Sequence, residues 1–210
     1  DPLLSGLKVR KMAKRTLDPK DFTKGTFQKT GSVREPLLVE GTLSCGGKEA
    51  SQFTRCHGPV LVQGTLNAEN THFEAGLQSQ GYTWLSDCKV NSQAGFAGRV
   101  TCKDTTFKDQ ITTVQGSSLN FEKCRVQDVR LEPAPWRWQW MAMLSRWIGR
   151  VGIVLEDSTI HNVSTSGKAH GVIILKGQSK ILGRLSNQVK VVDRRPKAIR
   201  VAELKTRTSH

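Results

Sequence analysis

The sequence predicts an all-β protein: a single-stranded parallel β-helix (β-solenoid) with a short Trp-rich helical insert and basic extensions. In such a fold each turn of the chain, called a rung here, cannot bury its apolar face alone and stacks on the next. Two features of the composition agree with this fold. The 19 glycines and the many Thr, Ser, Asn and Gln residues favour turns and short strands, and the aromatic content of 6% is low for a compact globule. A β-sandwich is the structural alternative.

Three columns of small or apolar residues carry the repeat. Their successive members lie 17, 17 and 19 residues apart: Ala68, Leu85, Cys102 and Phe121 in the first column, Thr71, Cys88, Thr105 and Cys124 in the second, and Phe73, Val90, Phe107 and Val126 in the third. Two polar residues separate the first column from the second, which indicates a corner. Gly81, Gly98 and Gly116 are expected to close the rungs at tight bends.

The pattern continues in both directions. Residues 37–41 are echoed by residues 60–64, and Leu155, Ser158 and Ile160 repeat the offsets of the three columns. Residues 172–181 are expected to form the final rung. The predicted organisation is therefore an extension over 1–35, rungs over 36–131, an insert over 132–150, rungs over 151–192 and a tail over 193–210.

The net charge of +14 is distributed unevenly. Residues 1–35 carry +5 and residues 193–210 carry +4, whereas residues 36–131 hold nine basic and nine acidic side chains. Basic ends on a neutral body indicate an acidic partner, such as nucleic acid, an anionic lipid surface or an acidic protein. Solvated tails without a partner are the alternative. The candidate basic contacts are Arg10, Lys11, Lys14, Arg15, Arg194 and Arg195.

The segment between the two repeat blocks holds four of the five tryptophans. Pro135 and Gly149 suit a helix start and stop. Between them Trp136, Trp140, Met143 and Trp147 form one apolar stripe at helical spacing. This predicted helix either covers the solenoid, docks into a partner groove, or inserts into a membrane interface. The four stripe residues are the candidate partner-docking residues.

The run at residues 64–73, together with residues 154–160 and 171–183, resembles the rungs of exported, polymer-forming β-solenoid proteins of bacteria, of the bactofilin-like kind. The resemblance covers residues 36–131 and 151–192, and the Trp-rich segment departs from it. It implies a non-enzymatic protein that polymerises or acts as a scaffold, in the bacterial cell envelope or periplasm.

The five cysteines cannot all pair within one chain. Cys88 and Cys124 share a column two rungs apart, about 9–10 Å by strand spacing, which is too far for a disulfide. With Cys102 they are expected to be small buried residues. Cys45 and Cys56 either pair or remain free.

No cofactor, metal, catalytic site or small-molecule substrate is predicted. The chain lacks the common nucleophile, phosphate and dinucleotide motifs, and Cys56-His57 alone makes a poor zinc site. Asp87 and Asp104 share a corner column and could bind calcium or act as an acid pair, but corners favour Asp for local reasons.

Three functional hypotheses follow. The first is a non-enzymatic scaffold or docking subunit that contacts itself end to end or contacts other proteins. The second is an accessory subunit of a large nucleoprotein or membrane assembly, bound through its basic ends and Trp helix. The third and weakest is a carbohydrate-active β-helix enzyme.

Overall fold

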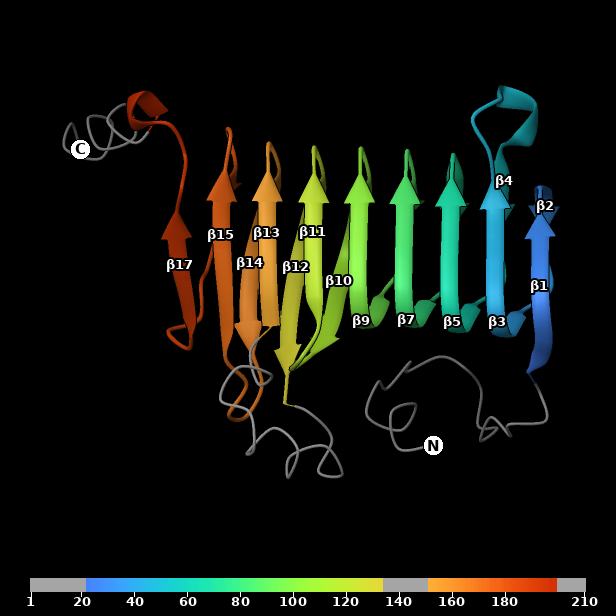
Figure 1. Ribbon diagram of the computed structural model, residues 1–210, viewed down its shortest axis with the longest axis horizontal. Coiled ribbons are helices and arrows are strands. Elements are labelled where there is room, and N and C mark those ends of the chain that lie inside the picture. Colours follow the sequence, from blue (N-terminus) through green and yellow to red (C-terminus); the bar gives the residue numbers. More distant parts are fainter. Residues whose placement is uncertain (1–21, 134–150, 200–210) are drawn as a thin grey trace.

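The computed structural model of the protein describes residues 22–133 and 151–199. They form one 17-stranded sheet that winds as a β-solenoid of about nine rungs, and every strand pairing is parallel (Figure 1). The predicted all-β solenoid is thereby confirmed. Among the described residues no helix is long and apolar enough to span a membrane.

The strands follow one another along the stack in sequence order. They are β1 (Thr23–Lys29), β2 (Gly31–Val33), β3 (Leu37–Gly46), β4 (Thr54–Cys56), β5 (Val60–Glu69), β6 (Thr71–Phe73), β7 (Leu77–Ser86), β8 (Lys89–Val90), β9 (Ala94–Lys103), β10 (Thr106–Val114), β11 (Ser118–Glu122), β12 (Arg125–Glu132), β13 (Val151–Glu156), β14 (Thr159–Thr165), β15 (Gly171–Lys176), β16 (Lys180–Ile181) and β17 (Val189–Asp193). A short 3-10 helix, η2 (Ala50–Gln52), interrupts the second rung.

The register confirms the predicted columns. Ala68, Leu85, Cys102 and Phe121 are Cα partners in successive rungs, and so are Phe73, Val90, Phe107 and Val126. Alternate side chains of each strand point inward, and these buried residues form one continuous core. Within that core the rings of Phe96, Phe107 and Phe121 meet edge to face at centroid distances of 6.1 and 6.0 Å.

A column of glycines bends the long strands midway. Gly25, Gly41, Gly64, Gly81 and Gly98 are in register, with φ between 114 and 134°. A Cβ on Gly81 would overlap the Gly64 carbonyl oxygen, so only glycine fits. The prediction that Gly81 and Gly98 close the rungs is therefore wrong. They bend continuous ten-residue strands, and the ladder of hydrogen bonds runs through the bend.

The 19-residue spacing has a local cause. After Gly98 the glycine bend is replaced by a tight turn between β10 and β11, where Gly116 has φ 90° and Ser117 N–H donates to the Val114 carbonyl at 3.1 Å. This turn adds two residues to the rung. The side chain of Ser117 also joins this turn to the glycine column, because Ser117 Oγ accepts a hydrogen bond from the Gly98 N–H at 3.2 Å.

The solenoid is longer than the sequence pattern predicts. β1 and β2 pair with β3 and β4, so a first rung begins before residue 36. β17 pairs with β15, so one more strand follows the rung expected to be final. Strand β17 ends at Asp193, the first residue of the predicted tail. The segment predicted to form a Trp-rich helix, most of the N-terminal extension and the end of the C-terminal tail lie outside the described residues.

Candidate functional site

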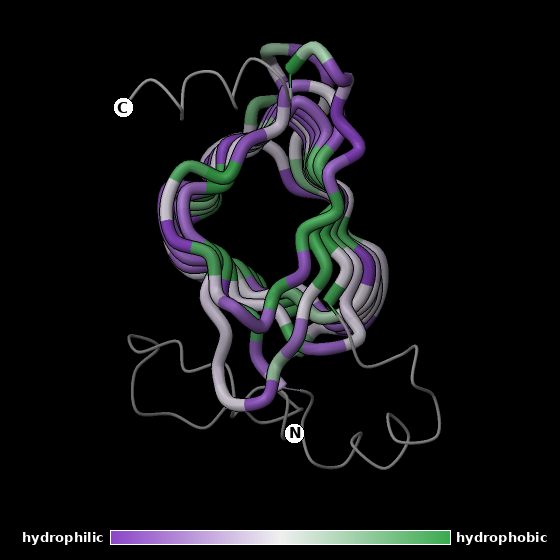
Figure 2. Tube along the Cα trace, turned by 90° about the vertical axis from the view of Figure 1, so that its left-hand side faces the viewer, coloured by the Kyte–Doolittle hydropathy of each residue, from purple (hydrophilic) through white to green (hydrophobic). Residues whose placement is uncertain are grey.

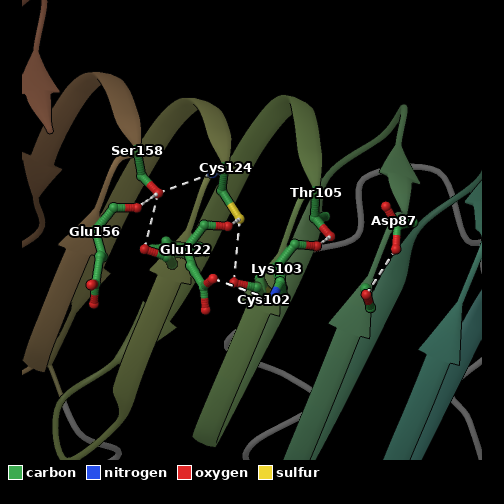
Figure 3. Close-up of polar contacts among 10 residues, drawn as sticks. Asp87, Cys102, Lys103, Thr105, Glu122, Cys124, Glu156 and Ser158 are labelled. Carbon is green, nitrogen blue, oxygen red and sulfur yellow. Dashed lines mark hydrogen bonds and ion pairs between the residues drawn. The ribbon is translucent and has the colours of Figure 1, made fainter. Parts of the chain in front are cut away.

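One corner of the solenoid repeats a small hydroxyl or thiol side chain. The residue before it has a left-handed backbone, with φ of 47–52° in five rungs. This geometry turns the next side chain inward, and its hydroxyl donates to the carbonyl two residues earlier, at 2.9 Å for Thr71, 2.8 Å for Thr105 and 2.8 Å for Ser158. Figure 3 shows these bonds for Thr105 and Ser158. We call this column the corner ladder: Thr54, Thr71, Cys88, Thr105, Cys124, Ser158 and Ser179.

The corner ladder also links neighbouring rungs. Ser158 Oγ accepts a hydrogen bond from the Cys124 N–H at 2.9 Å. The Ser158 hydroxyl also lies 2.8 Å from the Glu156 carbonyl oxygen and 2.9 Å from the Phe121 carbonyl oxygen of the preceding rung, and it can donate to both. Cys124 Sγ lies 3.4 Å from the Cys102 carbonyl oxygen. These bonds provide partners for polar atoms that the corner buries, so the ladder is a structural device.

The described cysteines are all buried free thiols. Burial raises the pKa of Cys88 and of Cys124 to about 12, and it raises the pKa of Cys102 well above its ordinary value. A neutral, buried thiol is a poor nucleophile and a poor metal ligand. The prediction that these three cysteines are buried core residues is confirmed. Cys88 and Cys124 act as small side chains that fill the corner, and Cys102 fills the first column.

Cys45 and Cys56 lie together in the core, 2% and 1% exposed, as a free thiol pair rather than a disulfide. A hydrogen bond with Cys56 and burial both raise the pKa of the Cys45 thiol above its ordinary value. The pairing alternative is therefore not realised in this structure. The two thiols connect the second rung's β3 and β4 within the apolar interior.

Asp87 and Asp104 occupy the left-handed corner positions, with φ of 52 and 47°. The Asp87 carboxylate accepts a hydrogen bond from Ser86 Oγ at 3.0 Å (Figure 3). Asp157 holds the same position and accepts the Gln178 N–H at 2.8 Å. The hydrogen bonds of Asp87 and Asp157 therefore stay local to the corner. In residues 22–133 and 151–199 no group of His, Cys, Asp and Glu is arranged to hold a metal ion.

The ends of the first column differ from its middle. This column runs in register from Lys29 through Cys45 and then through Ala68 to Leu175, and it ends at Asp193. Every intervening member is buried and apolar. Lys29 Nζ lies 3.5 Å from Glu35 Oε1. A charged residue therefore replaces the apolar one at the first rung and again at the last.

The last rung carries the stronger of these two ion pairs. Arg195 is 8% exposed, and its guanidinium lies 2.7 Å from Asp193 Oδ2 and donates from Nε to Oδ1 at 3.0 Å. Arg195 also donates to the Ser179 carbonyl at 3.1 Å. The arginine therefore covers the end of the corner ladder, and the aspartate covers the end of the first apolar column. We call these two residues the end cap.

The predicted contact residues are placed only in part. Arg194 is exposed, whereas Arg195 is buried in the end cap. Trp136, Trp140, Met143 and Trp147 lie outside the described residues, and so do Arg10, Lys11, Lys14 and Arg15. For these eight residues the docking roles remain predictions.

A basic hollow of about 570 Å³ lies on the outer side of the corner ladder. Lys123, Arg125 and Lys180 supply positive charge, and Asp157 contributes one carboxylate. Sequence reasoning missed this hollow and the end cap. The repeat carried no clear signal for the cap, because Asp193 follows Leu175 by 18 residues and Arg195 follows Ser179 by 16, and neither interval is a spacing of the predicted columns.

No protein-family model, curated protein or solved structure matches the chain. The resemblance to bactofilin-like proteins therefore stays a prediction.

Proposed function

We propose that this protein is a non-enzymatic structural subunit: a rigid solenoid that is capped at both ends and that positions the segments at its ends for docking to a partner. One observation carries the proposal. The first core column is apolar over all its inner rungs and charged at Lys29 and Asp193. If the solenoid stacked on a second copy of the chain, apolar residues would be expected at these two positions, because stacking is driven by the burial of apolar side chains.

Charge supports the capped form over end-to-end stacking. Lys29 and Asp193 have opposite signs, but each already has a partner within the chain, Glu35 and Arg195. The chain as a whole places its basic excess at both ends, so two copies meeting head to tail would bring like charges together. We therefore favour a heterologous partner, and self-association is the alternative function.

Sedimentation velocity over a wide concentration range tests this choice. A single species near the monomer mass of 23.3 kDa at every concentration is expected. Species that grow with concentration would overturn the capped form and favour a polymer-forming scaffold.

A matched variant sharpens the same experiment. Lys29→Leu combined with Asp193→Leu and Arg195→Ser restores the residue types of the inner rungs at both ends. We expect this variant to form concentration-dependent oligomers, because apolar rung ends are templates for stacking. A variant that folds and stays monomeric would show that the charged ends do not prevent assembly.

A further inference from the structure

The basic excess of the solenoid lies at its C-terminal end. Between residues 158 and 199 the chain holds eight Lys or Arg residues and one acid, Asp193, whereas residues 36–131 hold nine of each sign. We call residues 178–197 the terminal rung. Its exposed cations are Lys180, Arg184, Lys190, Arg194 and Lys197.

These cations surround the end of the stack. Lys180 lies on β16 and Lys190 on β17, while Arg184 lies in the segment between these strands and Arg194 follows β17. Since one rung passes once around the solenoid, its exposed side chains are distributed around the whole perimeter. Figure 2 looks onto this end, where the superposed rungs form a closed outline. The result is a rim of positive charge around one end of the solenoid.

Exposed apolar side chains lie within the same rim. Leu182 is 60% exposed and Leu185 is 40% exposed, and Tyr82 is the other exposed large hydrophobic residue of the described chain. Leu185 is in register with the buried Val163, so it belongs to a core column that no further described strand covers. Ile181 and Val191 of the terminal rung are only partly buried against the core.

Cations around exposed leucines match one kind of surface. At an anionic bilayer, Lys and Arg remain among the headgroups while Leu side chains enter the apolar boundary. Nucleic acid would attract the cations but would leave the leucines in water. A second copy would present its own basic first rung, with Lys24, Lys29 and Arg34.

We propose that the terminal rung is a docking surface for an anionic lipid bilayer, on which the solenoid stands end-on. This inference rests on the proposed function in one respect only, that the protein is a docking subunit, and it names the partner. The end cap contributes by closing the core column beside the leucines, so that the contact is peripheral.

Cosedimentation of the full chain with vesicles tests the proposal. The probes are vesicles of phosphatidylcholine alone and vesicles in which about one-third of the lipid is phosphatidylserine, at physiological ionic strength. We expect binding to the second kind that weakens steeply as salt is raised, and at least tenfold weaker binding to the first kind.

Two variants separate the two parts of the surface. Lys180→Gln with Arg184→Gln and Lys190→Gln is expected to lower the partition coefficient about 100-fold, at about fivefold for each basic residue. Its matched control is Lys48→Gln with Lys89→Gln and Lys108→Gln, three exposed cations on earlier rungs, with a change below about threefold because the bilayer lies beyond the Debye length. Unchanged melting temperatures establish that each variant is folded.

The apolar part has its own matched pair. Leu182→Ser is expected to reduce binding about tenfold, the factor for withdrawing one leucine side chain from an apolar phase. Tyr82→Ser, on the distant strand β7, is expected to leave binding unchanged. Equal losses in the two variants would overturn the assignment of the leucine to the contact.

Three results would overturn the inference. They are no binding to either vesicle, equal loss from the terminal-rung and control charge variants, and tight binding to a DNA duplex without binding to vesicles. A monomeric species in sedimentation velocity together with any of these would leave the proposed structural function standing. Oligomers of the wild type would overturn the capped form independently of the vesicle result.

Discussion

At the scale of single residues, the corner position is occupied by Thr, Ser or Cys, and one physical reason explains why all three residue types fit. A left-handed residue directs the next side chain inward toward backbone carbonyls, and Thr, Ser and Cys all carry a small donor that reaches them. Sulfur is the weakest donor of the three, and its thiol keeps its proton in this environment. Alternation of Thr71, Cys88, Thr105 and Cys124 along the column is therefore chemically conservative.

The buried thiols make stability fall at alkaline pH. In the unfolded chain a thiol loses its proton near pH 9, whereas Cys88 and Cys124 in the folded chain keep theirs to about pH 12, the pKa that burial gives them. Because the folded pKa is raised, the stabilisation is complete below about pH 9 and is lost as the pH rises toward 12. The upper limit is about 4 kcal/mol for each thiol. Thermal unfolding followed from pH 7 to 11 measures this loss.

The double variant Cys88→Thr and Cys124→Thr is the control for the alkaline effect. Threonine already occupies this column at residues 71 and 105, so the variant is expected to fold, and its melting temperature is expected to fall less between pH 9 and 11. An identical fall in the variant and the wild type would show that other groups cause it.

At the scale of elements, the long strands turn without ending. The glycine column lets β3, β5, β7 and β9 bend midway while their backbone bonds continue, because each glycine adopts a φ that side chains rarely adopt and lies against the carbonyl of the previous one. Where that column stops, a two-residue longer turn separates β10 from β11. The spacing of the repeat therefore reports how each rung makes its bend.

Substitution at a glycine tests the role of the column. Gly81→Ala is expected to lower the free energy of unfolding by about 2–4 kcal/mol, because it combines backbone strain with a close contact to the Gly64 carbonyl. Gly152→Ala in β13 is the matched control, since its new methyl group would point into open space and its φ is ordinary. It is expected to change stability by less than about 0.5 kcal/mol. Urea unfolding of both variants measures the difference, and equal effects would contradict the role of the column.

At the scale of the whole molecule, the solenoid is a repeat with defined ends. Each inner rung is covered by two neighbours, and the outer two rungs place charge where the others place apolar side chains. Terminal rungs with polar outer faces are what a repeat protein needs to remain a discrete particle. The basic terminal rung extends this logic, because it gives one end a surface with a partner chemistry of its own.

Breaking the end cap tests its contribution to stability. Asp193→Ala removes the carboxylate 2.7 Å from the Arg195 guanidinium, which is 8% exposed, and it is expected to cost about 1–3 kcal/mol. Glu40→Ala is the control, because its pair with Lys24 at 3.5 Å is exposed and is expected to contribute less than about 0.5 kcal/mol. Chemical denaturation of both variants checks this, and a cap variant as stable as the control would show that Asp193 does not hold the last rung.

The sequence alone determined the solenoid, its three columns, the corner and the burial of Cys88, Cys102 and Cys124. The residues of these features recur at a regular spacing along the sequence, and a stacked fold brings such residues into contact in neighbouring rungs. Only the tertiary structure decided where the solenoid starts and that Lys29 and Asp193 belong to the first column, because both residues break the pattern by residue type and only the strand register shows that they still belong to it. It likewise decided that Arg195 is buried and that Leu182 and Leu185 are exposed, since exposure at the last rung depends on whether another rung lies above it.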